Sequence, residues 1–284
     1  MSNIKKDVQF ENIEFVKVLK AKESPFLHYI QVVFENAREL MANRTPYAFP
    51  NYTLHNIEHS IRIANYMYDI VINQLNTPNT IGELDIVIML YSAILHDIGM
   101  VVNDEEVEQI RNNNYLIDTK NKYPIQVSGI KNIDWIKNIE KEEEQEKFAI
   151  QEYIRRMHGF RSKLYIETLH IEQKNLFLIP SFSTLNFHEE LALICQSHNE
   201  SYDWIKKNLK EEQIKGEYKY SPQFCACMLR LADILDIDER RAPSILLNSI
   251  NPQGRNKEEW LQHRVIQNTN KIIHKKALLI MYRY

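Results

Sequence analysis

A histidine and an aspartate stand side by side, as His96 and Asp97, at the end of a very apolar stretch of the sequence. From residue 84 up to this pair, Asp85 and Ser92 are the only clearly polar side chains. A run this apolar is expected to form a buried helix, and a carboxylate at its end is costly to bury unless a partner compensates its charge. The pair therefore predicts a partner for Asp97, which is a cation, a base or a metal ion.

Further histidines and a second aspartate occur in other apolar helical stretches. They are His59, His158, His198 and Asp233. Taken singly, each is more often a satisfied core residue or a helix cap than a ligand. Together with His96 and Asp97 they supply four imidazoles and two carboxylates. This mixed nitrogen and oxygen set suits a divalent transition metal or Mg²⁺ better than a thiolate zinc site would.

The order of these residues resembles that of the HD superfamily of metal-dependent phosphohydrolases. The likeness extends over residues 50–240 and rests on the motifs "EHS" (58–60), "LHDIG" (95–99), "RMHG" (156–159), "SH" (197–198) and "LRLADILD" (229–236). A narrower likeness links "RRMHG", "LRLADILDIDERRAP" and "EEWLQH" to bacterial HD modules fused to an Hsp90-type ATPase domain. The resemblance implies an all-α HD-type helical bundle, here expected as a single domain over 1–284 with an inserted segment at 102–140.

The resemblance also assigns roles to the six side chains. The positions that hold one metal ion in this superfamily are here His59, His96, Asp97 and Asp233. His158 and His198 match the extra histidines of two-metal members, and Asp97 would then bridge the two ions. The expected cofactor is therefore one or two divalent ions of Fe, Mn, Zn, Ni or Mg. Two cations about 3.5 to 4 Å apart can activate a water molecule and stabilise the charge that develops on a phosphoryl oxygen.

Several basic side chains near the motifs are candidates for binding a substrate phosphate. They are Arg62, Arg155, Arg156, Arg161 and Lys163, and guanidinium groups suit bidentate contacts with phosphate. Arg62 follows His59 by three residues and either contacts substrate during catalysis or forms a salt bridge. His55, one turn before His59, is either an acid–base or supporting residue or a cap at the helix start. Together with Asp97, Arg62 and His55 make up the predicted catalytic set.

Two positions depart from the superfamily pattern. Met100 stands where many members with this motif carry lysine, which removes one expected phosphate contact and leaves the metal set intact. Ser197 precedes His198, whereas members that hydrolyse cyclic dinucleotides carry two adjacent histidines there. A cyclic dinucleotide is therefore disfavoured as the substrate.

Helical periodicity dominates the elements that must position these residues. Ser24 and Pro25 predict the N-cap and first position of a helix that ends just before Pro46. Further helices are expected over 54–75, 84–98, 140–159, 188–198, 201–214 and 221–238, with Gly159 as a C-cap. Residues 175–182 predict a short strand or a buried loop. The Asn-rich and charged stretch 102–140 is either a surface connection or a lid over the site, with one short helix.

Composition limits the classes of function. The 284 residues include only 6 glycines and no glycine-rich phosphate loop, which argues against Rossmann and P-loop nucleotide sites. The net charge of −3 gives no global attraction to nucleic acid or anionic lipid. The spacing of Cys195, Cys225 and Cys227 indicates reduced thiols rather than disulfides. The sequence shows neither a signal-peptide pattern nor a membrane-spanning stretch, so a cytoplasmic location is expected.

Three functions remain open at this stage. The complete ligand set favours a hydrolase acting on a phosphoester or phosphoanhydride of a phosphorylated small molecule, most plausibly a nucleotide. The lack of an ATPase domain in this chain favours a catalytically silent, metal- or nucleotide-binding regulatory module of a larger ATPase-linked protein. A single-strand nuclease is a third candidate, against which the acidic balance argues. The expected macromolecular partner is an Hsp90-like ATPase domain or a second copy of this chain, with no membrane.

Overall fold

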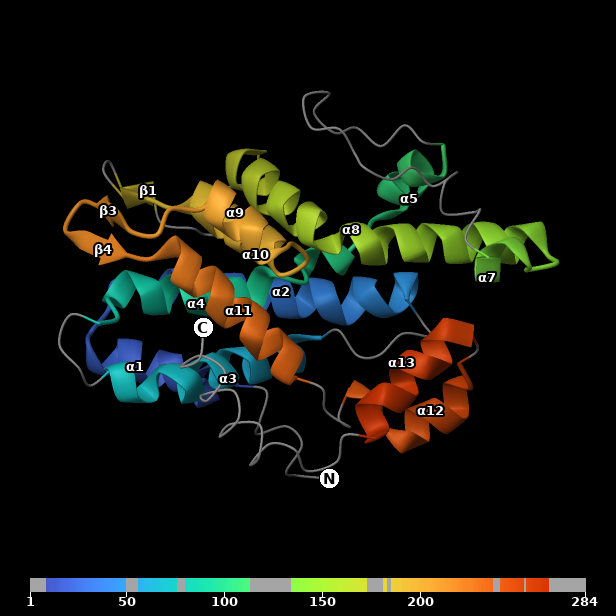
Figure 1. The fold of residues 1–284 in the computed structure, drawn as a ribbon, viewed down its shortest axis with the longest axis horizontal. Coiled ribbons are helices and arrows are strands. Elements are labelled where there is room, and N and C mark those ends of the chain that lie inside the picture. The colour runs from blue at the N-terminus through green and yellow to red at the C-terminus, as the bar shows by residue number, and fades with distance from the viewer. Residues whose placement is uncertain are drawn as a thin grey trace.

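The computed structural model describes residues 9–49, 56–75, 80–112, 134–172, 181–182, 185–236, 241–252 and 254–265. Over these residues the fold is all-α, as predicted, apart from two small hairpins (Figure 1). The helical elements are η1 (Phe10–Asn12), α1 (Glu14–Ala21), α2 (Leu27–Ala48), α3 (Ile57–Leu75), α4 (Glu83–Leu95), η2 (Ile98–Met100), α5 (Asp104–Arg111), α7 (Asp134–Lys137), α8 (Glu142–Glu172), α9 (His188–Ser197), α10 (Tyr202–Asn208), α11 (Pro222–Leu235), α12 (Ser244–Ile250) and α13 (Gly254–Val265). The antiparallel hairpins pair β1 (Ser181–Phe182) with β2 (Leu185–Asn186) and β3 (Gln213–Lys215) with β4 (Tyr218–Tyr220).

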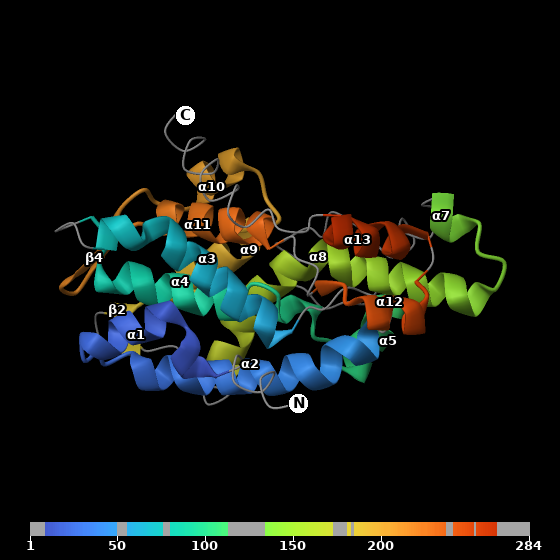
Figure 2. The same cartoon turned by 90° about the horizontal axis from the view of Figure 1, so that it is seen from below.

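Helix α4 is the centre of the main hydrophobic core. Every residue from Leu84 to Leu95 is buried, because α2, α3, α9 and α11 all pack against this helix. Figure 2 shows α3 and α4 lying beside each other, with α2 on one side of the pair and α9 and α11 on the other. In the described part of the chain, no single helix is long and apolar enough to cross a membrane. Only the pair Glu83–Met100 and Asp104–Arg111 meets that criterion jointly, across a bend of 59°.

Helix α8 differs from the prediction because it does not end at Gly159 but continues to Glu172. Glycine is needed there for close approach rather than for a cap, since a Cβ on Gly159 would lie 2.3 Å from Oδ1 of Asn199. The backbone N–H of Gly159 donates to that same oxygen at 2.9 Å. The two halves of α8 meet at an angle near α9 (Figure 1), so the helix joins the main bundle to the α5 and α7 region.

A second apolar cluster forms where the segment after the His96–Asp97 pair packs on the first half of α8. It comprises Phe49, Met100, Val102, Ile110, Ile136, Ala149, Ile150, Tyr153, Ile154 and Met157. The predicted insertion 102–140 thus holds two short helices, α5 and α7, in its described part, where one was expected. Residues 113–133 lie outside the described residues, so the choice between a lid and a surface connection stays a prediction.

Other helix boundaries also differ from the prediction; α4, for example, ends at Leu95 rather than at residue 98, and α11 ends at Leu235 rather than at residue 238. Helix α2 begins at Leu27 rather than Pro25 and runs through Pro46, which stands in its last turn, where only one backbone hydrogen bond is lost. Helix α10 ends at Asn208, because the chain then turns into the β3–β4 hairpin instead of continuing to residue 214. Helix α11 starts as predicted, with Ser221 as the N-cap and Pro222 at the first position.

Candidate metal centre

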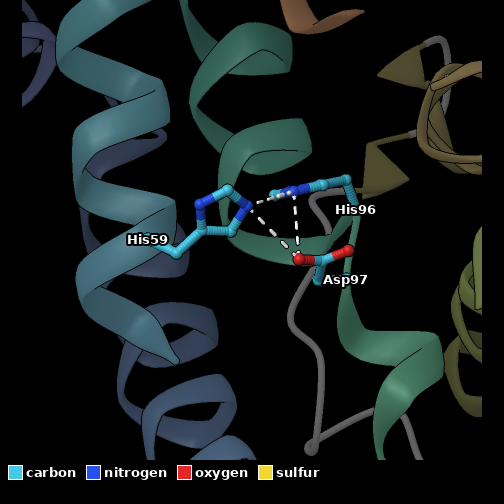
Figure 3. A group of neighbouring side chains, drawn as sticks. All are labelled: His59, His96 and Asp97. Atoms are coloured by element: carbon cyan, nitrogen blue, oxygen red, sulfur yellow. Dashed lines mark hydrogen bonds and ion pairs between the residues drawn. The ribbon is translucent and has the colours of Figure 1, made fainter. Parts of the chain in front are cut away.

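The first half of the centre is formed by α3 and the end of α4. His59 lies on the buried face of α3, and His96 caps the C-terminus of α4, so that Asp97 falls in the following turn. All three side chains are almost completely buried and point toward one another (Figure 3). Nε2 of His59 lies 3.1 Å from Nε2 of His96 and 3.3 Å from Oδ2 of Asp97. Nε2 of His96 lies 3.4 Å from the same carboxylate oxygen.

The second half of the centre lies on the other oxygen of Asp97. Oδ1 of Asp97 is 3.3 Å from Nε2 of His158, on α8, and 3.8 Å from Nε2 of His198, which caps the C-terminus of α9. The two Nε2 atoms are 2.6 Å apart. One carboxylate therefore presents one oxygen to each pair of imidazoles, which is the arrangement of a bridging ligand. His59, His96 and Asp97 form one ligand group and Asp97, His158 and His198 a second.

Asp233 completes the set of six. It lies on α11, and its Oδ1 is 3.4 Å from Nε2 of His59. Its side chain keeps 28% of its surface exposed and His158 keeps 12%, whereas His59 and Asp97 are nearly inaccessible. The six residues singled out from the sequence thus meet at one place, and solvent reaches them from the side of Asp233 and His158.

The outer nitrogens of three imidazoles are held by backbone carbonyls. Nδ1 of each ring donates a hydrogen bond to a backbone carbonyl oxygen. The distance from Nδ1 to this oxygen is 3.0 Å in His96, 2.5 Å in His158 and 2.5 Å in His198. The acceptors lie three residues earlier in each helix. A ring that donates from Nδ1 has a lone pair on Nε2, and two such lone pairs facing each other repel unless a cation lies between them. The donor set therefore fits a divalent metal ion on an observation independent of any resemblance.

The carboxylates favour positive charge at this point. Burial and the charge of Arg241 act to lower the pKa of His59. Hydrogen bonds to three carboxylates outweigh these effects and raise that pKa to about 9; the three are Asp233, Asp236 and Asp97. A proton on His59 thus takes the place that a cation would otherwise hold among these groups.

Two other imidazoles, those of His96 and His198, are kept neutral. Burial lowers the pKa of His96, and burial together with the neighbouring His158 and His96 lowers the pKa of His198 to about 3. Burial alone would raise the pKa of Asp233, but its hydrogen bond to His59 and the charges of the nearby histidines lower it. Neutral imidazoles and an ionised carboxylate are the forms that bind metal ions.

The turn that carries Asp97 is held against α8 by close packing and by hydrogen bonds between side chains of α8 and the backbone of the turn. Gly99 lies so close to α8 that a Cβ would meet the carbonyl oxygen of His158 at 2.0 Å. Ser162 accepts the N–H of Gly99 at 2.9 Å and donates to the carbonyl of His96 at 2.5 Å. Arg161 donates to the carbonyls of Gly99 and Val101 at 2.7 and 2.9 Å.

The predicted substrate contact of Arg161 is therefore corrected, since this side chain is fully buried and holds the turn. Its guanidinium also pairs with Glu106 of α5 at 3.2 Å. Arg62 takes the second role considered for it, a salt bridge: it donates to both oxygens of Asp236 at 2.7 and 3.0 Å.

The other predicted phosphate-binding residues are partly exposed and ion-paired. Arg155 and Arg156 share the buried carboxylate of Glu152, with N–O distances of 2.6 Å each, and Lys163 pairs with Glu167 at 2.8 Å. Arg155 lies one helical turn before His158, whose Nδ1 donates to its carbonyl. The candidate acid–base residue His55 lies outside the described residues.

Asp236 is a site residue that the sequence analysis missed. Its Oδ2 accepts from Nδ1 of His59 at 2.6 Å, and the side chain is completely buried. Two signals could have found it: Asp236 follows Asp233 by one helical turn, and Arg62 follows His59 by one turn and needs an acidic partner.

Comparisons with known proteins bear on this site in one way. The HD-CE family model matches residues 49–282, a range that contains all six predicted ligands and Asp236. No curated protein and no solved structure matches the chain.

Proposed function

The chain belongs to the HD-CE family, an HD-type family, and from this together with the geometry of its centre we propose that it is a metal-dependent phosphohydrolase. The reaction proposed is hydrolysis of a phosphoester or phosphoanhydride, with a nucleotide as the substrate class. The observation that carries the proposal is the Asp97 carboxylate, which presents one oxygen to each of two pairs of imidazole Nε2 atoms. A site of this kind needs no protein nucleophile.

The side chains of the centre would bind two divalent ions between them. His59, His96 and Asp233 would hold one divalent ion, His158 and His198 a second, and Asp97 both. Bound ions would supply a water nucleophile at neutral pH and stabilise charge on the phosphoryl oxygen. Helices packed on each other hold these ligands more firmly than loops would. The buried side of the centre excludes water, so substrate enters past Asp233 and His158.

The pair Arg155 and Arg156 supports phosphate recognition beside this entrance. Both guanidinium groups form ion pairs with one carboxylate, that of Glu152, so the three side chains together have a net charge of +1. Their side chains remain 23% and 35% exposed. A guanidinium that is held in place and still accessible loses little entropy when it binds phosphate. These two arginines are therefore the proposed phosphate contacts, with Lys163 as a further candidate, and His55 stays the candidate acid–base residue.

The test combines metal analysis with a phosphate-release screen over nucleotides and simple phosphate esters. We expect the purified protein to hold divalent metal and to release phosphate, and Asp97→Ala to lose both. Asp85→Asn is the matched control, because it removes a buried carboxylate at the opposite end of α4 and should keep turnover. Bound metal without turnover of any substrate would contradict the proposal and favour the regulatory module, linked to an ATPase domain or not.

A separate arm of the test addresses the nuclease. Labelled single-stranded DNA and RNA are incubated with the metal-loaded protein at increasing salt. Cleavage with a steep loss of binding as salt rises would replace the small-molecule substrate by nucleic acid. We expect no cleavage under conditions in which nucleotides are hydrolysed.

A further inference from the structure

One of the four imidazoles in the centre is supported differently from the others. Nδ1 of His96, His158 and His198 donates to a neutral backbone carbonyl of the same helix turn. Nδ1 of His59 instead contacts a carboxylate oxygen of Asp236 at 2.6 Å, across 177 residues of sequence. The two halves of the centre therefore differ in the groups that hydrogen-bond to their candidate ligands, as well as in the ligands themselves.

Asp236 is firmly held in this position. It caps the C-terminus of α11, where its side chain has no exposed surface. The Arg62 guanidinium donates to Oδ1 from Nε at 2.7 Å and to Oδ2 at 3.0 Å, and its own side chain is only 11% exposed. Because both oxygens already accept hydrogen bonds and lie on the Nδ1 side of His59, Asp236 supports a ligand rather than acting as one.

A carboxylate behind a ligating imidazole has two effects. It fixes the tautomer of the neutral ring, so that Nε2 offers its lone pair to a metal ion, and it increases the electron density that the ring donates to that ion. The same half of the centre also contains Asp233, whose Oδ1 lies 3.4 Å from Nε2 of His59. Among the described residues, the carboxylate recorded within 4 Å of His158 and His198 is Asp97. Charge and imidazole strength therefore both favour the His59 half.

We infer that Asp236 is a positioning residue that makes the His59 half of the centre the tighter ion site, so that the two halves fill in a fixed order. The inference deepens the proposed function, because it concerns the metal centre on which that function rests. The His59 half fills first and retains its ion. The His158 half, in which Asp97 is the carboxylate that contacts the imidazoles, fills second and exchanges its ion more readily.

Arg62 acts through Asp236 in this arrangement. Its two donors keep the carboxylate ionised and oriented toward His59, whereas a lysine ammonium cannot bind both oxygens with a fixed fork. Arg62→Lys should therefore change the same ion site as Asp236→Asn, by a smaller factor.

The experiment titrates the metal-free full chain with Mn²⁺ and follows free Mn²⁺ by electron paramagnetic resonance, with no substrate present. Wild type should bind two ions in two resolved steps. Asp236→Asn should weaken the first step by about 10- to 100-fold, the range found for such outer carboxylates, and leave the second step unchanged. His158→Ala should remove the second step and keep the first. Asp85→Asn is the matched control and should preserve both steps, and thermal melting verifies that each variant is folded.

Two results would overturn the inference: Asp236→Asn and Arg62→Lys leaving both Mn²⁺ affinities unchanged, or Asp236→Asn weakening both steps equally. Either result would leave phosphate release by wild type untouched. Conversely, the protein could bind its two ions in an order that depends on Asp236 and yet hydrolyse no phosphate compound. That result would contradict the proposed function and support this inference. The two ideas therefore fail by different measurements.

Discussion

Replacement of Gly99 by alanine tests how the centre is held together. The added Cβ would lie 2.0 Å from the carbonyl oxygen of His158 and 2.6 Å from the backbone nitrogen of Ser162. Both are backbone atoms of α8, so no side chain can rotate away. Since nonbonded atoms need about 3.5 Å, the turn must move from α8 by about 1.5 Å.

The cost of that movement follows from the contacts that it breaks. Overpacking in a tight interior costs about 1 to 3 kcal/mol. The hydrogen bond from Gly99 to Ser162 and the charged one from Arg161 to the carbonyl of Gly99 are also weakened, which adds about 1 to 3 kcal/mol. We expect Gly99→Ala to lower the free energy of unfolding by about 3 to 5 kcal/mol, a large share of the total for a domain.

Urea unfolding followed by circular dichroism measures this loss, and the Mn²⁺ titration measures its effect on the centre. Because the movement separates Asp97 from His158, the second binding step should weaken even where the variant is folded. Gly216→Ala is the control: its φ of 60° in the β3–β4 hairpin makes alanine strained, at about 1 to 2 kcal/mol, without touching α8. A loss below about 1 kcal/mol for Gly99→Ala, with both binding steps intact, would refute the close packing of the turn on α8.

Three further predictions concern groups around the centre. Glu152→Gln should lower stability by about 1 to 3 kcal/mol at neutral pH, as measured by urea unfolding. Burial raises the pKa of Glu152, but Arg155 and Arg156 outweigh it and lower that pKa, so its stabilisation is present above the unfolded pKa and the gap to wild type should close as pH falls below about 4. Arg161→Met should cost about 3 to 5 kcal/mol in the same assay, because it leaves the buried carbonyls of Gly99 and Val101 without their donor. Removal of metal by a chelator should lower the melting temperature of wild type and not that of Asp97→Ala, since an ion at 100 times its Kd contributes about 2.7 kcal/mol.

The sequence predicted most helices because their apolar periodicity is the same feature that packs them. The continuous apolar run of α4 predicted burial on all sides, and α1, α2, α3, α9 and α11 all contact it. The errors arise where tertiary contacts override a local signal. Gly159 has the chemistry of a helix end, yet α8 continues through it, and the glycine instead leaves room for the side chain of Asn199. Residues 209–214 follow a helical pattern, yet β3 pairs with β4 there.

The six candidate ligands could be singled out because each is a polar group in an apolar setting, a combination that sequence alone displays. The roles of the arginines could not be found in this way, because an arginine near a motif is equally suited to phosphate and to a buried carboxylate. Arg161 binds backbone carbonyls, and Arg62 and Arg155 each pair with a buried carboxylate. The folded chain adds that Arg155 keeps 23% of its side chain exposed, whereas Arg161 is fully buried.

The distribution of the candidate ligands over the helices explains why the turn that carries Asp97 is held by several contacts with α8. His59 and Asp233 come from the contacting helices α3 and α11, while His158 and His198 come from the contacting helices α8 and α9. The His59 half is thus built on the α3–α11 pair and the end of α4, which carries His96, and the other half on the α8–α9 pair. The turn that carries Asp97 supplies the candidate ligand common to both halves. Any shift of one pair against the other changes the separation of the two candidate ion sites. The absence of a Cβ at Gly99 and the hydrogen bonds from α8 to the turn hold that separation, so residues outside the candidate ligand set fix the geometry that the proposed two-ion chemistry would need.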